Sequence, residues 1–126
     1  MSVKDADFSK YISEYENFPK SGILFRDISP LLASPVAMQA AVESFTNQLG
    51  HFNADMIVGI ESRGFLFSTL LAYRLGIGSL MIRKQGKLPG VLFKQNYALE
   101  YGEATLEIQN SVQIRGKSMI LIDDLL

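Results

Sequence analysis

MIVGIESRGFLFSTLLAYRLGIGSLMIR, residues 56–83, is the stretch that decides the fold. Met56 to Ile60 is a short apolar run followed by a polar turn, which is typical of a buried strand. Residues 65–75 predict a helix that Gly76 ends, and Ser79 to Arg83 is a second apolar run. A strand–turn–helix–strand unit of this kind predicts two parallel strands joined by a right-handed crossover.

Further elements are expected on the C-terminal side of this unit. Ser118 to Ile122 is a third apolar run and predicts another buried strand. Gly86 to Asn96 contains two glycines and a proline and predicts a loop. Tyr97 to Glu100 and Ala104 to Gln109 flank a Tyr-Gly-Glu turn, and this pattern predicts a hairpin or flap.

On the N-terminal side the pattern predicts two helices with an extended piece between them. Aromatic and apolar residues recur at helical spacing within residues 7–16, where Asp7 is a candidate cap. Ile23 to Asp27 is expected to be extended. Ser34 is a capping residue followed by proline, and it predicts the start of a second helix that Gly50 ends.

Composition excludes several classes of protein. A chain of 126 residues, 48% hydrophobic and 20% charged, is expected to fold as a single domain, residues 1–126, rather than stay disordered. Its net charge of -1 gives no basic field that would attract nucleic acid. The absence of cysteine excludes disulfides and thiolate metal sites, and a single histidine, His51, excludes His-rich zinc sites. His51 itself is expected at the surface or as a satisfied core residue.

The sequence also shows neither a membrane-spanning segment nor a signal peptide. No apolar run approaches the roughly 20 residues that are needed to span a bilayer. The mixed-charge N-terminus lacks the apolar stretch of a signal peptide. We therefore expect a soluble, cytoplasmic protein with neither a membrane nor a nucleic acid as partner.

Two carboxylates, Asp123 and Asp124, follow the strand expected at residues 118–122. In parallel α/β sheets ligands gather at the carboxyl ends of the strands, so both side chains can turn toward ligand hydroxyls or a hard cation such as Mg²⁺. The alternative is a solvated strand end.

Positive charge indicates an anion site in two segments. Arg63 lies in the turn at 61–64, before a helix start whose backbone N–H groups can bind an anion. A capped turn with a surface arginine is the alternative. A second segment carries four cations with no acid among them, namely Arg83, Lys84, Lys87 and Lys94. Such a segment can close over a phosphate as a lid, and a solvated loop is the alternative.

Two single residues are further candidates. Glu100 stands between Tyr97 and Tyr101, and a carboxylate on a flap could exchange a proton with a ring nitrogen. A solvated hairpin carboxylate is the alternative. Phe25 could stack on a planar ring or could belong to the core.

Taken together and in this order, these segments resemble the adenine phosphoribosyltransferases, of the type I phosphoribosyltransferase group. The resemblance covers nearly the whole chain. The segments that carry it are FPKSGILFRDISPLL (18–32), GIESRGFLF (59–67), IRKQGKLPG (82–90), LEYGEATLEIQ (99–109) and ILIDDLL (120–126). DDLL alone indicates the wider group, whereas FPKSGILFRD and LEYG indicate the adenine branch.

The resemblance implies a fold and a reaction. The fold is α/β, a mostly parallel central sheet flanked by helices, with an N-terminal hood at residues 1–34 and a hairpin lid at 84–109. The sheet would be incomplete at its C-terminus. The reaction converts adenine and phosphoribosyl pyrophosphate into AMP and pyrophosphate with Mg²⁺, in a homodimer.

The resemblance also implies residue roles for the base and the pyrophosphate. Phe25 would stack on adenine, while backbone groups of Leu24 and Arg26 would read the edge of the ring. The pyrophosphate loop would comprise Glu61, Ser62 and Arg63, with a cis peptide expected between the first two.

The remaining roles concern the lid and the sugar. Arg83 and Lys87 match basic lid residues that contact pyrophosphate, in one arrangement across a dimer interface, and Lys84 is a weaker match. Glu100 matches the proton-transfer residue, and Tyr101 is its neighbour on the lid. Asp123 and Asp124 match the pair that holds the ribose hydroxyls, directly or through Mg²⁺.

One feature of the family does not occur in this sequence. After DDLL the family continues into a small-residue loop, ATGGT-like, that grips the 5′-phosphate, and then into further sheet elements. If residues 1–126 were the whole molecule, we would expect poor substrate binding and a destabilised sheet edge. Two other functions stay open, a non-catalytic nucleotide-sensing module and a phosphoribosyltransferase for another purine. Glu100 and the basic lid argue against the first, and FPKSGILFRD argues against the second.

Overall fold

The computed structural model describes residues 7–99, 102–110 and 114–124. Its chain divides into two compact units, Met1–Leu49 and Gly50–Leu126. The expectation of one domain with a hood and a lid stays a prediction.

The N-terminal unit begins with a short 3₁₀ helix and a strand, where a helix over residues 7–16 was expected. The 3₁₀ helix η2 spans Ser9–Tyr11, and β1 spans Ser13–Glu16. β1 pairs antiparallel with β2, Leu24–Asp27. The helix prediction was therefore wrong over β1, because ladder hydrogen bonds to a distant segment replace the local bonds of a helix. The extended piece predicted at 23–27 is confirmed.

The turn between β1 and β2 is fixed by local contacts. Asn17 adopts a positive φ of 58°, and its side-chain oxygen accepts the N–H of Gly22 at 2.8 Å. The peptide bond between Phe18 and Pro19 is cis. The ring of Phe18 meets that of Phe25 edge to face with centroids 5.0 Å apart, which ties the turn to β2.

Two helices complete this unit. α1, Ser29–Ala33, was not expected from the sequence, and it begins where the Asp27 carboxylate accepts the Ser29 N–H at 2.9 Å. α2 spans Pro35–Leu49 and confirms the predicted start, because the Ser34 hydroxyl accepts the Ala37 N–H at 3.2 Å. The helix ends at Leu49, before Gly50, as predicted.

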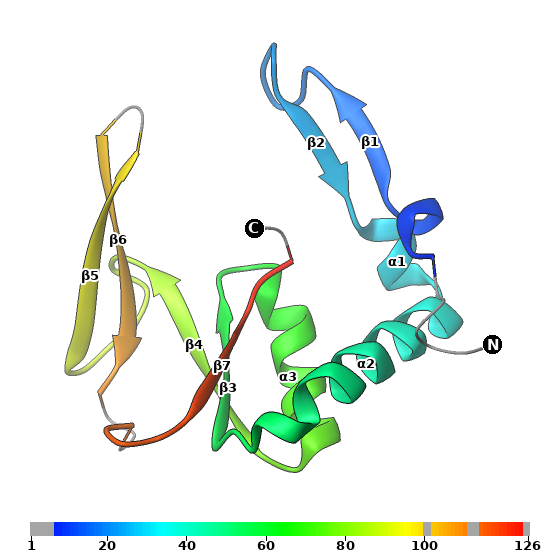
Figure 1. Ribbon diagram of the computed structural model, residues 1–126. Helices are drawn as coiled ribbons and strands as arrows, with labels where there is room; N and C mark the ends of the chain where they lie inside the picture. Colours follow the sequence, from blue (N-terminus) through cyan, green and yellow to red (C-terminus); the bar gives the residue numbers. More distant parts are fainter. Residues whose placement is uncertain (1–6, 100–101, 111–113, 125–126) are drawn as a thin grey trace. The chain divides into compact units, whose positions relative to one another are not determined.

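The C-terminal unit is built on a five-stranded sheet in the order β5-β6-β4-β3-β7 (Figure 1). β3 pairs in parallel with β4 and with β7, while β6 pairs antiparallel with β4 and β5. The strands are β3 (Met56–Ile60), β4 (Gly78–Lys84), β5 (Leu92–Leu99), β6 (Gly102–Gln109) and β7 (Met119–Ile122). The predicted parallel pair, the third strand and the hairpin are confirmed. β5 begins at Leu92, inside the segment expected to be a loop.

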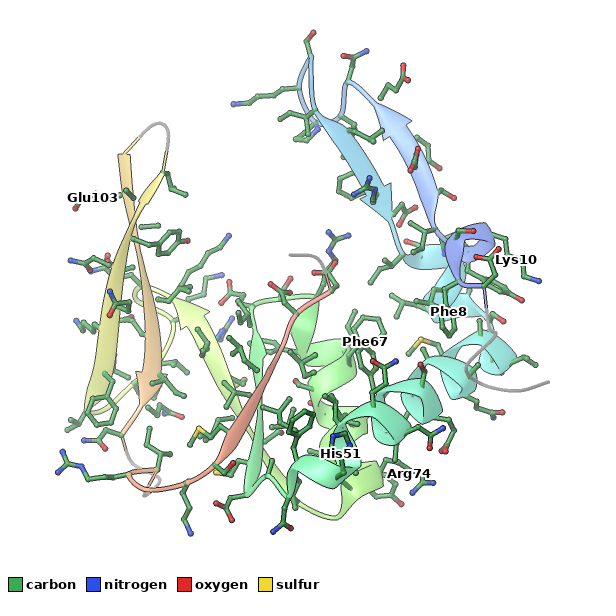
Figure 2. All side chains as sticks on the ribbon, viewed as in Figure 1. Phe8, Lys10, His51, Phe67, Arg74 and Glu103 are labelled. Atoms are coloured by element: carbon green, nitrogen blue, oxygen red, sulfur yellow. The ribbon has the colours of Figure 1, made fainter. Side chains whose placement is uncertain are left out.

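Helix α3, Gly64–Leu75, covers one face of this sheet (Figure 1). A Cβ atom on Gly59 of β3 would lie 2.8 Å from Cβ of Ser68, so only glycine allows the helix to approach this closely. Gly76 ends the helix at a φ of 73°, and its N–H donates to carbonyls of the last turn. Between α2 and β3, the 3₁₀ helix η3 (Gly50–Phe52) carries His51 in an exposed position (Figure 2).

Candidate active site

The candidate site lies at the carboxyl ends of β3, β4 and β7. These strands are parallel neighbours, so the segments that follow them leave the sheet at the same edge. Glu61–Gly64 follows β3, Gln85 follows β4, and Asp123 follows β7.

The turn after β3 is held against both neighbouring strands. The Glu61 N–H donates to the carbonyl of Ile82 on β4 at 2.9 Å. On the other side, a Cβ atom on Gly64 would lie 2.8 Å from the carbonyl oxygen of Ile122 on β7. Glycine at this position therefore lets the turn lie directly on the end of β7. The peptide bond between Glu61 and Ser62 is cis, as expected. The carbonyl of Ser62 accepts the Phe65 N–H at 3.2 Å and so starts α3.

Arg63 forms an ion pair with the second aspartate after β7. Its Nε atom lies 2.8 Å from Oδ2 of Asp124, whose side chain is 10% exposed. Burial raises the pKa of Asp124, and a hydrogen bond with Asp123 and the charge of Asp123 add to this, while the charge of Arg63 acts against it. The Asp123 carboxylate also accepts the Asp124 N–H at 2.8 Å. One arginine and two carboxylates thus meet at the strand end.

Glu61 gathers the cations of the basic segment. Its Oε1 atom accepts Nε of Arg83 at 3.0 Å and the backbone N–H of Lys84 at 3.3 Å. Its Oε2 atom lies 3.0 Å from Nζ of Lys87. These contacts, above all the hydrogen bond from Lys87, lower the pKa of Glu61 to about 2. The carboxylate is therefore ionised at neutral pH.

Lys94, the fourth cation of the basic segment, pairs with another acid. It lies on β5, and its Nζ is 3.2 Å from Oε2 of Glu107 on β6. Glu61 was a candidate for the pyrophosphate loop, but its pairing with the basic segment and that of Glu107 were not predicted, because both acids lie outside that segment. A charged residue between Leu106 and Ile108 in a strand was the available signal for Glu107.

The structure brings most predicted residues for the pyrophosphate and the sugar to one sheet edge. They are Glu61, Ser62, Arg63, Arg83, Lys84, Lys87, Asp123 and Asp124. Glu100 and Tyr101 lie outside the described residues. They fall between Leu99 and Gly102, which are opposed across the hairpin.

The predicted adenine residues belong to the N-terminal unit. Leu24, Phe25 and Arg26 are consecutive on β2, and the Arg26 guanidinium lies 3.7 Å from the carboxylate of Glu14 on β1. Beside them is a hollow of about 250 Å³, lined by Glu16, Asn17, Gly22, Ile23 and Leu24. Leu24 is exposed and Phe25 is half-buried.

Asp123 and Asp124 are the metal-binding candidates of the site. Mg²⁺ in phosphate-binding sites is usually held by one or two carboxylates together with substrate phosphates. Within the described residues, no group of three or more acidic, histidine or cysteine side chains is placed to hold a metal ion. Two adjacent carboxylates are oxygen ligands of the kind that Mg²⁺ takes.

Comparison with known proteins identifies the family. Residues 31–126 match the phosphoribosyl transferase domain. The chain is 49% identical to the adenine phosphoribosyltransferase of Nitrosopumilus maritimus, with 91% of this chain and 68% of that protein covered. It is 45% identical to the adenine phosphoribosyltransferase of Rhodospirillum rubrum, with 100% and 71% covered. This chain belongs to the adenine phosphoribosyltransferases.

Solved adenine phosphoribosyltransferases share the fold. The Saccharomyces cerevisiae enzyme, complexed with D-2,5-dideoxy-2,5-imino-altritol 1,6-bisphosphate and adenine, superposes with a TM-score of 0.87 at 40% identity, covering 97% of this chain and 70% of that one. The Giardia lamblia enzyme, complexed with 9-deazaadenine, gives 0.85 at 35% identity, covering 96% and 66%. The predicted α/β phosphoribosyltransferase fold and the glycosyltransferase class are confirmed. No helix within the described parts of this adenine phosphoribosyltransferase is long and apolar enough to cross a membrane.

Proposed function

We propose that this adenine phosphoribosyltransferase transfers the phosphoribosyl group of phosphoribosyl pyrophosphate to adenine, giving AMP and pyrophosphate. The observation that carries the proposal is the set of ion pairs at the sheet edge. Arg63 is paired with Asp124, and Arg83 and Lys87 are paired with Glu61. These pairs support the proposal, because they bring cations that suit a diphosphate and a carboxylate that suits a sugar to one strand-end turn.

Arg63, Arg83 and Lys87 would bind the pyrophosphate part of the substrate. When the bond between C1′ and the pyrophosphate oxygen breaks, negative charge grows on the leaving group, and nearby cations stabilise it. Glu61 would hold Arg83 and Lys87 in place rather than touch the diphosphate, because its carboxylate is an anion whose two oxygens already pair with these cations. Its ion pairs keep the two cations together at the sheet edge.

Asp123 and Asp124 would accept hydrogen bonds from the ribose hydroxyls or hold Mg²⁺. Bound there, Mg²⁺ would supply positive charge that neutralises the diphosphate. The pKa of Asp124 is raised because this carboxyl is partly buried and lies beside the carboxyl of Asp123, which disfavours its ionised form. A hydrogen bond from a ribose hydroxyl, or a bound cation, would stabilise the ionised form.

Adenine would bind at β2. Residues two apart on a strand direct their backbone groups to the same edge, so those of Leu24 and Arg26 can read one edge of a planar base. The Phe25 ring would stack on its face. A ring nitrogen of adenine attacks C1′, pyrophosphate leaves, and the surplus proton of adenine passes to a base, the role that we propose for Glu100.

The test measures AMP formation and ligand binding by the purified protein and by Arg63→Ala and Glu100→Gln. We expect Arg63→Ala to lower turnover by about 10²–10³-fold, the usual cost of losing one positioned donor to a developing charge. For Glu100→Gln we expect a loss of roughly 10²–10⁴-fold, the range for general acid–base help. Unchanged turnover in both variants would refute these roles.

Titration calorimetry with adenine, AMP and phosphoribosyl pyrophosphate distinguishes an enzyme from a protein that only binds nucleotides. Binding of all three without product would indicate a nucleotide sensor. Turnover with another purine in place of adenine would indicate a different specificity.

Two further proposals concern the assembly and its place in the cell. We propose a homodimer, which light scattering of the purified protein would test. We also propose a cytoplasmic location, which cell fractionation would test.

A further inference from the structure

Glu107 is a buried acid that the proposed mechanism does not use. It lies on β6, and its side chain is only 1% exposed. Arg83 on β4 and Lys94 on β5 are its directly opposed partners in the antiparallel ladders. Opposed residues project from the same face of a sheet, so the acid stands between two cations.

Both carboxylate oxygens of Glu107 are occupied. Oε1 accepts the backbone N–H of Gly86 at 2.7 Å, and Oε2 lies 3.2 Å from Nζ of Lys94. The pKa of Glu107 is lowered, chiefly by the hydrogen bond from Gly86, so the carboxylate stays ionised. A charged acceptor makes a shorter and stronger bond to a backbone N–H than a neutral one does.

The bond to Gly86 fixes the turn that carries Lys87. Gly86 has a φ of 86°, a left-handed conformation that favours glycine. The preceding residue, Gln85, donates its N–H to the carbonyl of Thr105 on β6 at 3.1 Å. Two successive backbone groups are therefore attached to β6. Lys87 follows immediately, and its ammonium reaches Glu61 at 3.0 Å.

We propose that Glu107 is a positioning residue for the diphosphate site. It holds the Gly86 turn on β6, and thereby directs Lys87 toward the sheet edge where Arg63 and Arg83 lie. The proposal rests on the proposed function, because it takes Lys87 as a ligand of the diphosphate. Glu107 touches neither substrate. Its effect reaches the substrate through one backbone hydrogen bond and the side chain that follows it.

The experiment compares four variants in phosphoribosyl pyrophosphate and adenine titrations. Glu107→Ala removes both contacts of the acid, while Glu107→Gln keeps an oxygen that can accept the Gly86 N–H. Lys94→Met removes the ion pair and leaves the bond to Gly86 in place. Lys87→Met removes the proposed diphosphate ligand. Amide hydrogen exchange at Gly86, followed by NMR, reports on the bond itself.

We expect Glu107→Ala to weaken phosphoribosyl pyrophosphate binding about tenfold, equivalent to one well-placed contact. Adenine binding should stay unchanged, and exchange at Gly86 should become faster. Glu107→Gln should restore affinity to within about threefold of the parent protein. Lys94→Met should leave both the affinity and the protection of Gly86 unchanged.

Several outcomes would overturn the proposal, and they can be told apart from failure of the proposed function. If Lys87→Met binds phosphoribosyl pyrophosphate as the parent protein does, the role of Lys87 is wrong and the role of Glu107 falls with it. If Lys87→Met weakens binding and Glu107→Ala does not, only the role of Glu107 is wrong.

Equal losses in Glu107→Ala and Lys94→Met would show that the acid acts through Lys94. If Glu107→Ala does not fold, Glu107→Met takes its place, because methionine has a similar length and offers no carboxylate oxygen to the Gly86 N–H. A loss of affinity confined to phosphoribosyl pyrophosphate, with faster exchange at Gly86, then supports the proposal, and unchanged values overturn it.

Discussion

At the scale of single residues, Glu61 organises the site because its carboxylate pairs with two cations. Its two oxygens receive Arg83 and Lys87 as well as a backbone N–H. The basic segment looked unpaired in the sequence because this partner lies more than twenty positions earlier in the chain. A segment of like charges in the sequence can therefore form ion pairs in the structure, because the fold brings an acidic residue from elsewhere in the chain to it.

The depressed pKa of Glu61 predicts a pH dependence of stability. A carboxylate whose pKa falls from 4.5 to about 2 on folding stabilises the folded state above pH 4.5, and this contribution is lost as the pH falls toward 2. We therefore expect Glu61→Gln to lose less stability than the parent protein between pH 4.5 and pH 2. Urea unfolding at a series of pH values measures the difference. Glu103→Gln, which changes an exposed carboxylate on the hairpin (Figure 2), is the matched control and should follow the parent protein. Parallel curves for the parent and Glu61→Gln would contradict the assignment.

At the scale of elements, the sequence specified those parts that depend on local pattern. The apolar runs at β3, β4 and β7 and the cap at Ser34 are local signals, and all four were predicted correctly. Residues 7–16 misled because their apolar spacing fits a helix, whereas pairing with β2 decides the outcome. No local signal in those residues reveals a partner strand that lies beyond a turn.

The contact between α3 and β3 gives a prediction at this scale. Gly59→Ala would place a methyl group 2.8 Å from Cβ of Ser68, which is too close for a van der Waals contact. We expect a loss of about 1–3 kcal/mol in the free energy of unfolding, typical of overpacking in a core. Urea unfolding measures it. Gly78→Ala is the control, since its added methyl group would meet only the flexible end of Met56 at 3.4 Å. Equal stabilities of the two variants would show that α3 can move away from the sheet at little cost.

The start of α2 gives a second prediction for an element. Ser34→Ala removes the hydroxyl that accepts the Ala37 N–H and leaves that donor without its cap. The expected cost is about 1 kcal/mol of unfolding free energy. Ser34→Asp restores an acceptor at the same position and should recover most of the loss. Thermal unfolding of the parent protein and both variants measures it. If alanine and aspartate behave alike, the cap does not contribute to stability.

At the scale of the whole molecule, topology assembles the site from residues that are far apart in the chain. Arg63, Lys87 and Asp124 each follow a different strand, and the parallel order of β4, β3 and β7 brings them to one edge. That convergence could be predicted, because parallel strands share a carboxyl edge. The individual ion pairs could not, since they depend on which oxygen of Glu61 or Asp124 each cation reaches.

The overall charge of the chain and its local charge together predict how substrate binding responds to salt. The net charge is only -1, so long-range attraction of an anionic substrate is weak. The attraction for phosphoribosyl pyrophosphate then comes from Arg63, Arg83 and Lys87 at short range. Dissolved ions weaken this attraction, because they screen the three cations and the diphosphate from each other. Raising KCl from ~50 mM to ~500 mM should raise the KM for phosphoribosyl pyrophosphate several-fold and leave the KM for adenine nearly constant. Lys87→Met should show a shallower dependence than the parent protein, because one of the cations is gone. An equal rise of both KM values, or an unchanged slope in Lys87→Met, would mean that these cations do not bind the diphosphate.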